Sequence, residues 1–387
     1  MFHSRVPLIA AMAALLGCGV VALSADKSKP AGPAKTEVRE NFIVHEWGTF
    51  STFAGSDGVY RKVYPDDRDL PQFVYSRHRN IKGGLPDVFV SLETPVLYFY
   101  TDRAMTASVR VHFPKGRITE WYPQASRPPG DSQTWENIQI APKVALTFPR
   151  EKGKSRYYAA RETDATPLQV EDGKGKMEAE KFLFYRGVGD FQMPLTVRAL
   201  GHGAFTVKNK GKDALAAFVL VHVQDGKVRF TVHDHFSQGA EVEAREPREE
   251  STTEKLGEAM AELLMREGLY EKEARAMVKT WSADWFGEDG TRVLYLVPAR
   301  LIDELLPLHI TPKPSALLRV LVGRHDVLTP ERESDIDRLV SKLDGPSQAE
   351  AKAADRGLNQ LGRYRWPAQE ASRARLKGLK EARKPGQ

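Results

Sequence analysis

Residues 218–233 contain the pattern that most restricts the fold of this chain. Asp225-Gly226 is a sequence favoured in two-residue type I′ turns, and residues on both sides of it alternate between apolar and polar. A turn at this dipeptide places three apolar pairs opposite each other: Val223 and Val228, Val221 and Phe230, Val219 and Val232. Because these six side chains share one face, the pattern predicts a half-buried antiparallel hairpin.

Similar strand patterns fill the chain from residue 42 to about residue 235. Short runs rich in β-branched and aromatic residues are separated by Gly, Pro, Asp or Asn. These runs are FIVHEWGTF (42–50), TPVLYFYT (94–101), ASVRVHF (107–113), WENIQI (135–140), KFLFYRG (181–187), PLTVRAL (194–200) and AFTVKN (204–209). We therefore predict an antiparallel, β-sandwich-like domain over residues 42–240.

The pattern becomes helical at residue 251. Ser251-Thr-Thr-Glu254 is a capping box, and Thr329-Pro330 is typical of a helix start. Residues 292–297 and 317–323 favour strands, and a second cap at Ser347 opens a further helix. The sequence thus predicts an α+β fold, in which a smaller mixed part (251–345) packs on the β-rich domain. The charged stretch 241–250 is the expected boundary, and 346–387 is the expected helical, basic tail.

The N-terminal segment predicts export. Residues 1–25 combine Arg5, an apolar stretch, and small residues at Ala22 and Ser24, as in a cleaved signal peptide. Residues 26–41 favour a flexible spacer, and no later segment is apolar enough to span a membrane. We expect a secreted or periplasmic protein. The alternative is a membrane-anchored lipoprotein attached through Cys18, which lies in a sequence similar to a lipobox and is the single cysteine.

The positive charge of the chain is concentrated at its C-terminus. Residues 362–387 contain eight Lys or Arg and two Glu, a net charge of +6, which equals the formal charge of the whole chain. The remaining chain therefore has no basic excess with which to bind nucleic acid, and we expect no nucleic-acid partner. The composition of 362–387 is typical of a solvated tail, so its deletion is expected to leave the fold intact.

Several strings together resemble a known family. They are VHEWGTF at 44–50, ETPVLYFY at 93–100, TEWYP at 119–123, FLFYRGVGDF at 182–191 and GTRVLYLVP at 290–298. They are similar to an uncharacterised family of exported bacterial proteins with a VHEWGTF string near the mature N-terminus. The resemblance covers about residues 42–330. It implies export and a shared architecture, and it implies no activity, cofactor or catalytic residue.

Two isolated charges are the first candidates for functional residues. Glu46 is the single charge on a strand face otherwise made of Phe, Val and Gly, and Arg186 is the single charge on a face with two Phe. The simplest interpretation is a buried structural ion pair between Glu46 and Arg186. The alternative is that Glu46 is a catalytic carboxylate with a raised pKa, together with Glu288, as in a glycosidase-like hydrolase.

Aromatic and histidine residues are the other candidates. His45, Trp47, Trp281 and Trp285 are candidate binding residues, because aromatic rings beside carboxylates bind sugars; packing in the core is the competing interpretation. His222, His233, Asp234 and His235 are the candidates for a metal site, but their spacing along the hairpin is unfavourable. We expect no metal and no cofactor. The leading hypothesis is a non-enzymatic envelope or extracellular binding protein, with a glycan-like polymer as its partner.

Overall fold

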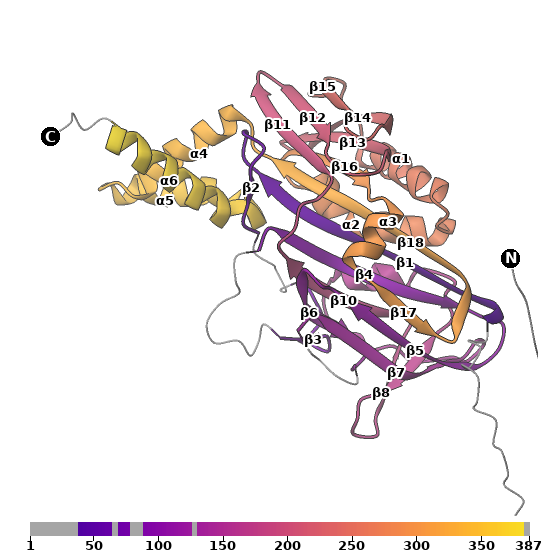
Figure 1. The fold of residues 1–387 in the computed structure, drawn as a ribbon. Helices are drawn as coiled ribbons and strands as arrows, with labels where there is room; N and C mark the ends of the chain where they lie inside the picture. Colours follow the sequence, from indigo (N-terminus) through magenta and orange to yellow (C-terminus); the bar gives the residue numbers. More distant parts are fainter. Residues whose placement is uncertain (1–37, 64–68, 78–87, 126–129, 383–387) are drawn as a thin grey trace, which may run out of the picture. The chain divides into compact units, whose positions relative to one another are not determined.

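The computed structural model describes residues 38–63, 69–77, 88–125 and 130–382, and its fold is α+β, as the sequence predicts (Figure 1). The expected signal peptide (1–25), Cys18 and most of the expected spacer (26–41) lie outside the described residues. Within the described ranges, every helix is too short or too polar to cross a membrane.

A ten-stranded sheet forms the centre of the fold, with the order β14-β13-β16-β18-β1-β4-β10-β6-β3 and with β2 paired to β1 (Figure 1). Its strands are β1 (Val38–Ala54), β2 (Tyr60–Arg61), β3 (Tyr75–Ser76), β4 (Val90–Tyr100), β6 (Gly116–Tyr122), β10 (Phe182–Gly189), β13 (Leu215–Gln224), β14 (Lys227–Phe236), β16 (Gly290–Leu296) and β18 (Lys313–Val327). β1 and β18 are parallel, and their neighbours in the sheet pair antiparallel. The predicted hairpin forms β13 and β14 with the predicted register.

Two smaller antiparallel sheets and the short helix α3 (Ala299–Leu305) cover one face of the central sheet. One contains β17 (Leu308–Thr311), β5 (Met105–His112), β7 (Ser132–Ile140), β8 (Leu168–Glu171) and β9 (Met177–Glu180), and the other contains β11 (Leu195–Gly201), β12 (Ala204–Asn209) and β15 (Glu241–Arg245). Side chains from both smaller sheets, such as Trp135 and Phe205, share one apolar core with Phe50 of β1. This packing of sheet on sheet confirms the sandwich-like prediction.

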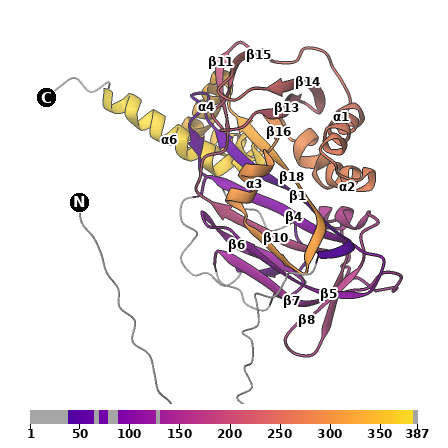
Figure 2. The same cartoon turned by 45° about the vertical axis from the view of Figure 1, so that its right-hand side comes forward.

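Helices cover the other face of the central sheet. α1 (Thr253–Arg266) and α2 (Glu271–Ser282) lie beside β13, β16 and β18 (Figure 2), and the 3-10 helix Arg156–Arg161 packs against α2. Their apolar stripes enclose Trp47 and Val320 of the sheet. The N-cap of α1 is Thr252, whose hydroxyl accepts a hydrogen bond from the amide of Lys255 at 3.2 Å. The helix thus begins one residue later than a cap at Ser251 implies.

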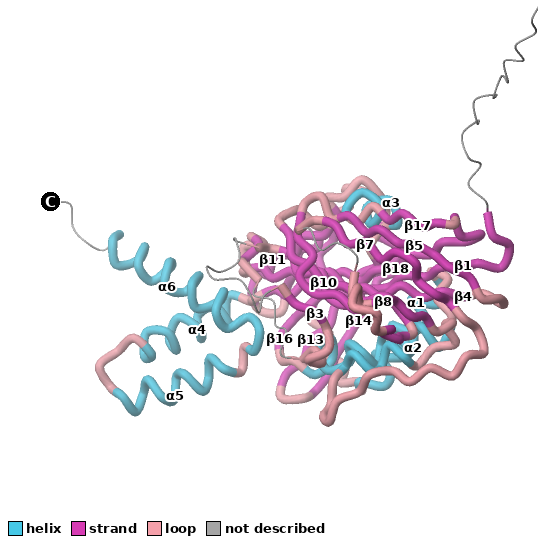
Figure 3. The backbone as a smooth tube through the Cα atoms, turned by 90° about the horizontal axis from the view of Figure 1, so that it is seen from below, coloured by secondary structure: helices cyan, strands magenta, loops and turns pink. Residues whose placement is uncertain are grey.

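Three C-terminal helices group at one end of the sheets: α4 (Pro330–Leu343), α5 (Gln348–Asn359) and α6 (Arg365–Ala382) (Figure 3). Thr329 and Ser347 cap α4 and α5, as the sequence predicts. A third apolar core, with Ile336, Leu358 and Ala368, joins these helices to Phe53 of β1. The segment 346–387 is therefore packed on the protein over most of its described length, rather than solvated as expected.

The three arginines of α6 have partners on the neighbouring helices. Arg373 pairs with Asp344 at 2.9 Å, and Arg375 pairs with Asp337 at 2.8 Å; both carboxylates belong to α4 or its C-cap. Arg365 pairs with Asp355 of α5 at 2.5 Å. The basic composition of this segment thus complements the acidic surface of the neighbouring helices.

The expected boundary at 241–250 does not divide the protein into two domains. β16 and β18, which follow this boundary in the sequence, lie between β13 and β1 inside the central sheet. Residues 37–387 form one compact unit. The stretch 241–250 marks a change from strands to helices along the chain. It is not a domain boundary, because the later strands β16 and β18 return to the middle of the same sheet.

The glycine of the VHEWGTF string has a packing role. A Cβ atom at Gly48 would lie 2.9 Å from the Cα of Pro95 on β4, closer than ordinary carbon contacts. The register of β1 against β4 shifts between Trp47 and Thr49, and Thr94 opposite this shift has a φ of 51°. Glycine allows the close backbone approach that this β-bulge requires.

Candidate functional site

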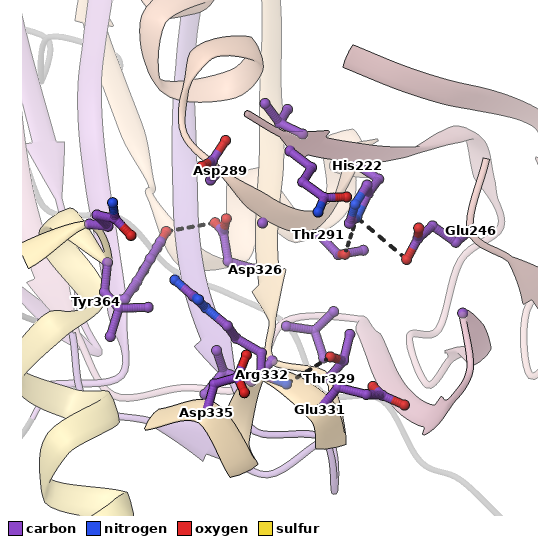
Figure 4. Close-up of a pocket in the computed structure, with 18 of the residues that line it drawn as sticks. His222, Glu246, Asp289, Thr291, Asp326, Thr329, Glu331, Arg332, Asp335 and Tyr364 are labelled. Carbon is purple, nitrogen blue, oxygen red and sulfur yellow. Dashed lines mark hydrogen bonds and ion pairs between the residues drawn. The ribbon is translucent and has the colours of Figure 1, made fainter. Parts of the chain in front are cut away.

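A cavity of about 500 Å³ lies where the ends of β13, β16 and β18 meet α4 and the chain after α5 (Figure 4). Its size is within the range of small-molecule sites. Apolar residues such as Phe53, Val327 and Leu328 line it together with polar ones, which include His222, Glu246, Asp289, Thr291, Arg332 and Tyr364.

The strand side of the cavity contains a histidine, His222, with a lowered pKa. Nδ1 of His222 lies 2.9 Å from the hydroxyl of Thr291 and 3.5 Å from a carboxylate oxygen of Glu246. Burial lowers the pKa of His222, and the nearby Glu246 only partly offsets this effect. Both partners contact the same ring nitrogen. This arrangement therefore differs from a catalytic triad, in which the acid and the nucleophile contact opposite nitrogens.

The helix side of the cavity is formed by the start of α4. The hydroxyl of Thr329 accepts a hydrogen bond from the amide of Arg332 at 3.2 Å, which fixes the first turn of the helix. Glu331 accepts a hydrogen bond from the amide of His202 at 2.8 Å. Figure 4 shows that the side chain of Arg332 extends from α4 toward the strands, on the side of Asp326 and Tyr364.

The inner wall of the cavity is formed by Asp326, which is buried. Its carboxylate accepts hydrogen bonds from Arg324 at 2.6 Å, from Arg292 at 2.9 Å and from the Tyr364 hydroxyl at 2.6 Å. Burial alone would raise the pKa of Asp326, but the two guanidinium groups outweigh it and hold this pKa well below its usual value. Asp326 is thus a fixed anion that already has its partners.

Asp326 belongs to a larger set of charges, called here the arginine–carboxylate network. It consists of Arg156, Arg186, Arg292, Arg324, Arg363, Asp69, Glu93, Asp284, Glu288 and Asp326. Arg363, which precedes α6, donates to Glu93 at 2.8 Å and to Asp284 at 3.0 Å. Each guanidinium of this network contacts at least one of its carboxylates, so the network connects β4, β10, β16, β18 and the C-terminal helices. Its five arginines and five carboxylates leave it without a net formal charge.

Three charged residues that line the cavity have side chains that make neither an ion pair nor a hydrogen bond in the part of the chain that the structure describes. They are Arg332 on α4, Asp225 in the β13–β14 turn and Asp289 just before β16. Arg332 is half-buried, and the two aspartates are exposed. Their charges are available to a ligand.

The predicted pair of Glu46 and Arg186 is wrong, although both residues are buried. Glu46 accepts hydrogen bonds from Arg319 of β18 at 2.6 Å and from the Tyr185 hydroxyl at 2.6 Å. Arg186 pairs with Asp69 at 2.8 Å. The physical reason is that the two residues lie on opposite faces of the sheet: neighbours of Glu46 face the smaller sheets, and neighbours of Arg186 face the helices.

The structure does not bring the two candidate catalytic carboxylates together. Glu46 is fully buried beside Arg319. Glu288 follows the π-helical turn Ala283–Gly287, and its carboxylate pairs with Arg324 at 2.5 Å. Each acid is held by a different arginine, and they share no cleft.

The aromatic candidates lie in the core. Trp47, Trp281 and Trp285 are fully buried under the helices, so they form no exposed binding surface. His45 is also buried, and its Nδ1 lies 2.8 Å from a carboxylate oxygen of the fully buried Glu273 on α2. These rings therefore pack in the core, as the competing interpretation predicts.

The histidine candidates for a metal site are dispersed. His222 faces Thr291 and Glu246, whereas His233 stacks on the ring of Phe218 with 4.4 Å between centroids. Asp234 contacts Arg266, and His235 is exposed beside Ser237. Among the described residues, no group of three or more His, Cys, Asp and Glu is arranged to hold a metal ion.

A buried histidine next to the network makes stability depend on pH. Burial lowers the pKa of His325 from 6.5 to about 4, and its Nδ1 lies 2.8 Å from the Thr52 hydroxyl. The unfolded chain therefore binds more protons as the pH falls through 6.5, so stability is lost on acidification. We expect the free energy of unfolding to decrease by about 2 kcal/mol between pH 7.5 and pH 5 from this group.

Urea unfolding of the protein and of the His325→Gln variant across this range measures the effect. The difference between the two profiles isolates His325 from Glu180, whose pKa is raised by burial and whose contribution has the opposite sign. Parallel profiles would contradict the prediction.

Comparisons with known proteins identify no family. No protein-family model matches the chain, and no curated protein sequence matches it. Among solved structures, the yeast delta-COP-I mu-homology domain matches with a TM-score of 0.32 and 8% identity, covering 76% of this chain and 100% of that chain. The same domain in complex with a Dsl1 WxWxV peptide matches with a TM-score of 0.31 and 7% identity, covering 75% and 100%. A similarity at this level supports no inference about function.

Proposed function

We propose that this chain is an exported, non-enzymatic binding protein of the cell envelope or extracellular space, and that its cavity takes one unit of a polar polymer such as a glycan. The observation that supports the proposal most directly is the cavity of about 500 Å³, which is lined by polar and apolar side chains together. Its volume suits one sugar unit with its linkages.

The lining offers several groups that match sugar hydroxyls. Thr291, Thr329, Gln224 and Gln360 provide hydroxyl and amide groups around the cavity, and both glutamines are exposed. Such groups both donate and accept hydrogen bonds, as a polyhydroxylated ligand requires. Tyr364 and Phe53 provide aromatic rings of the lining, in place of the tryptophans that the sequence suggested.

Binding is favoured over hydrolysis because Asp326 and Glu288 are held by arginines, and the unpaired Asp225 and Asp289 of the cavity are exposed to solvent. A glycosidase needs one carboxyl group that exchanges its proton near neutral pH and a second one that faces the same bond. Asp326 is kept ionised by two arginines, and Glu288 pairs with Arg324. Both carboxylates are held by arginines rather than left to exchange a proton with a bound substrate.

An oligosaccharide array with neutral, amino-bearing and carboxylate-bearing members tests this proposal on the purified mature protein. We expect saturable binding to at least one member, without release of reducing ends. Replacing Gln224 and Gln360 by Ala should weaken the binding about tenfold, and Gln139→Ala, on the exposed face of β7, is the matched control. Release of reducing ends would identify a hydrolase, and failure to bind any member would reject the glycan proposal.

A further inference from the structure

Unpaired charges of opposite sign line the same cavity. Arg332 extends toward the strands from α4, and Asp289 lies just before β16 (Figure 4). Asp225 lies in the turn after β13. The described part of the chain offers none of the three an ion pair within 4.0 Å. Contact between opposite charges would be favourable, so these side chains remain available to a ligand that carries the complementary charges.

The other charged groups of the cavity are accounted for. Asp326 is held by Arg324 and Arg292, and Glu246 faces His222. Glu331 accepts the amide hydrogen of His202, and Asp335 pairs with Arg338 on the outer side of α4. The side chains that are left without any partner in the described part of the chain are therefore one guanidinium on the helix wall, that of Arg332, and two carboxylates on the strand wall, those of Asp225 and Asp289.

We propose that the ligand unit bound in this cavity is zwitterionic and carries both an ammonium group and a carboxylate. This inference rests on the proposed function and specifies the chemistry of the same site. Arg332 binds the carboxylate, since the planar guanidinium matches its two oxygens. Asp225 and Asp289 bind the ammonium group from the opposite wall.

The electrostatics disfavour ligands with one kind of charge. A ligand with only an ammonium group leaves the half-buried Arg332 without a partner, and a ligand with only a carboxylate meets the acidic strand wall. A neutral sugar uses neither set of charges. A zwitterion satisfies both walls and adds no net charge to the cavity.

Four related sugars separate these possibilities by isothermal titration calorimetry at low ionic strength. Muramic acid has both charges, N-acetylmuramic acid has only the carboxylate, glucosamine has only the ammonium group, and N-acetylglucosamine has neither. We expect muramic acid to bind about tenfold more tightly than either singly charged sugar and about a hundredfold more tightly than N-acetylglucosamine.

Two variants test which wall of the cavity binds the carboxylate and which binds the ammonium group of the ligand. Arg332→Gln should lower the affinity for muramic acid about tenfold and leave the affinity for glucosamine unchanged. Asp289→Asn should lower the affinity for both amino-bearing sugars and leave that for N-acetylmuramic acid no weaker. Arg103→Gln and Asp102→Asn are the matched controls, because these residues lie 65% and 61% exposed after β4, outside the cavity lining.

The outcomes distinguish this inference from the proposed function. If N-acetylglucosamine binds as tightly as muramic acid, or Arg332→Gln behaves like Arg103→Gln, the zwitterion inference is overturned and the glycan proposal stands. If the dipeptide glycylglycine binds as tightly as muramic acid, the zwitterion inference is supported and the glycan proposal fails. Failure of all five probes to bind overturns the inference.

Discussion

Deletion of residues 362–387 is expected to destabilise the protein by more than about 5 kcal/mol, enough to leave little folded protein. The deletion removes Arg363, which contacts the buried Glu93 at 2.8 Å, and Tyr364, which donates to Asp326 at 2.6 Å. It also exposes the apolar core around Ile336. Removing one partner of a buried ion pair costs about 3–5 kcal/mol, and the lost apolar contacts add to this cost.

Two point variants distinguish the contribution of the arginine–carboxylate network to stability from that of the outer surface of α6. Arg363→Met should lower the free energy of unfolding by about 3–5 kcal/mol, because it leaves Glu93 and Asp284 with fewer cations. Arg373→Met, at a half-exposed pair on the outside of α6, should change little. Urea unfolding and the yield of soluble protein provide the measurements. A truncated protein that unfolds at the same urea concentration as the full chain would contradict the role of this segment.

The sequence pattern of this segment predicted the opposite result, for a definable reason. Its composition is polar and basic, which is typical of a solvated tail. The acids that neutralise Arg373, Arg375 and Arg365 lie on α4 and α5, and Arg363 reaches Glu93, which is 270 positions away in the sequence. Composition indicates that a segment is charged, but it does not indicate which other segment supplies the opposite charge.

Local patterns, by contrast, predicted local structure correctly. The Asp225-Gly226 turn, with both residues at positive φ, forms the hairpin with the predicted pairs. The helix start at Thr329-Pro330 is also where the sequence places it. These features depend on contacts between neighbours in the sequence, such as a hydroxyl and an amide three residues later. The same alternation showed that Glu46 and Arg186 are buried charges, but it did not show which face of the sheet each one occupies.

The cavity was not predictable in this way, because it joins segments far apart in the sequence. His222, Thr291 and Arg332 come from two strands and a helix, and Tyr364 follows α5. Each of these residues has an ordinary local context, so no motif distinguishes it. A partial signal exists for Asp289, because it lies in the acidic pair Glu288-Asp289 before a predicted strand, but the partner of Glu288 is on β18.

The pair that Glu46 does form gives the second large expected effect. Arg319→Met should lower the free energy of unfolding by about 3–5 kcal/mol, because it leaves the fully buried Glu46 with only the Tyr185 hydroxyl as its partner. Glu46→Gln should cost less, since Arg319 keeps its contact with Asp303 at 2.8 Å at the edge of the core. Urea unfolding at pH 7.5 measures both effects.

The double variant Glu46→Gln/Arg319→Met provides the decisive comparison. With both charges gone, neither one is left buried without a partner, so we expect the double variant to recover most of the stability that Arg319→Met loses. Asp303→Asn, which changes the exposed end of the pair, is the control and should change little. If the losses of the single variants simply add, the two side chains do not interact, and the stability of this region depends on packing alone. Recovery would show that Glu46 has a structural role and destabilises the fold only when Arg319 is missing. A carboxylate that is held in this way is unsuited to be a catalytic acid.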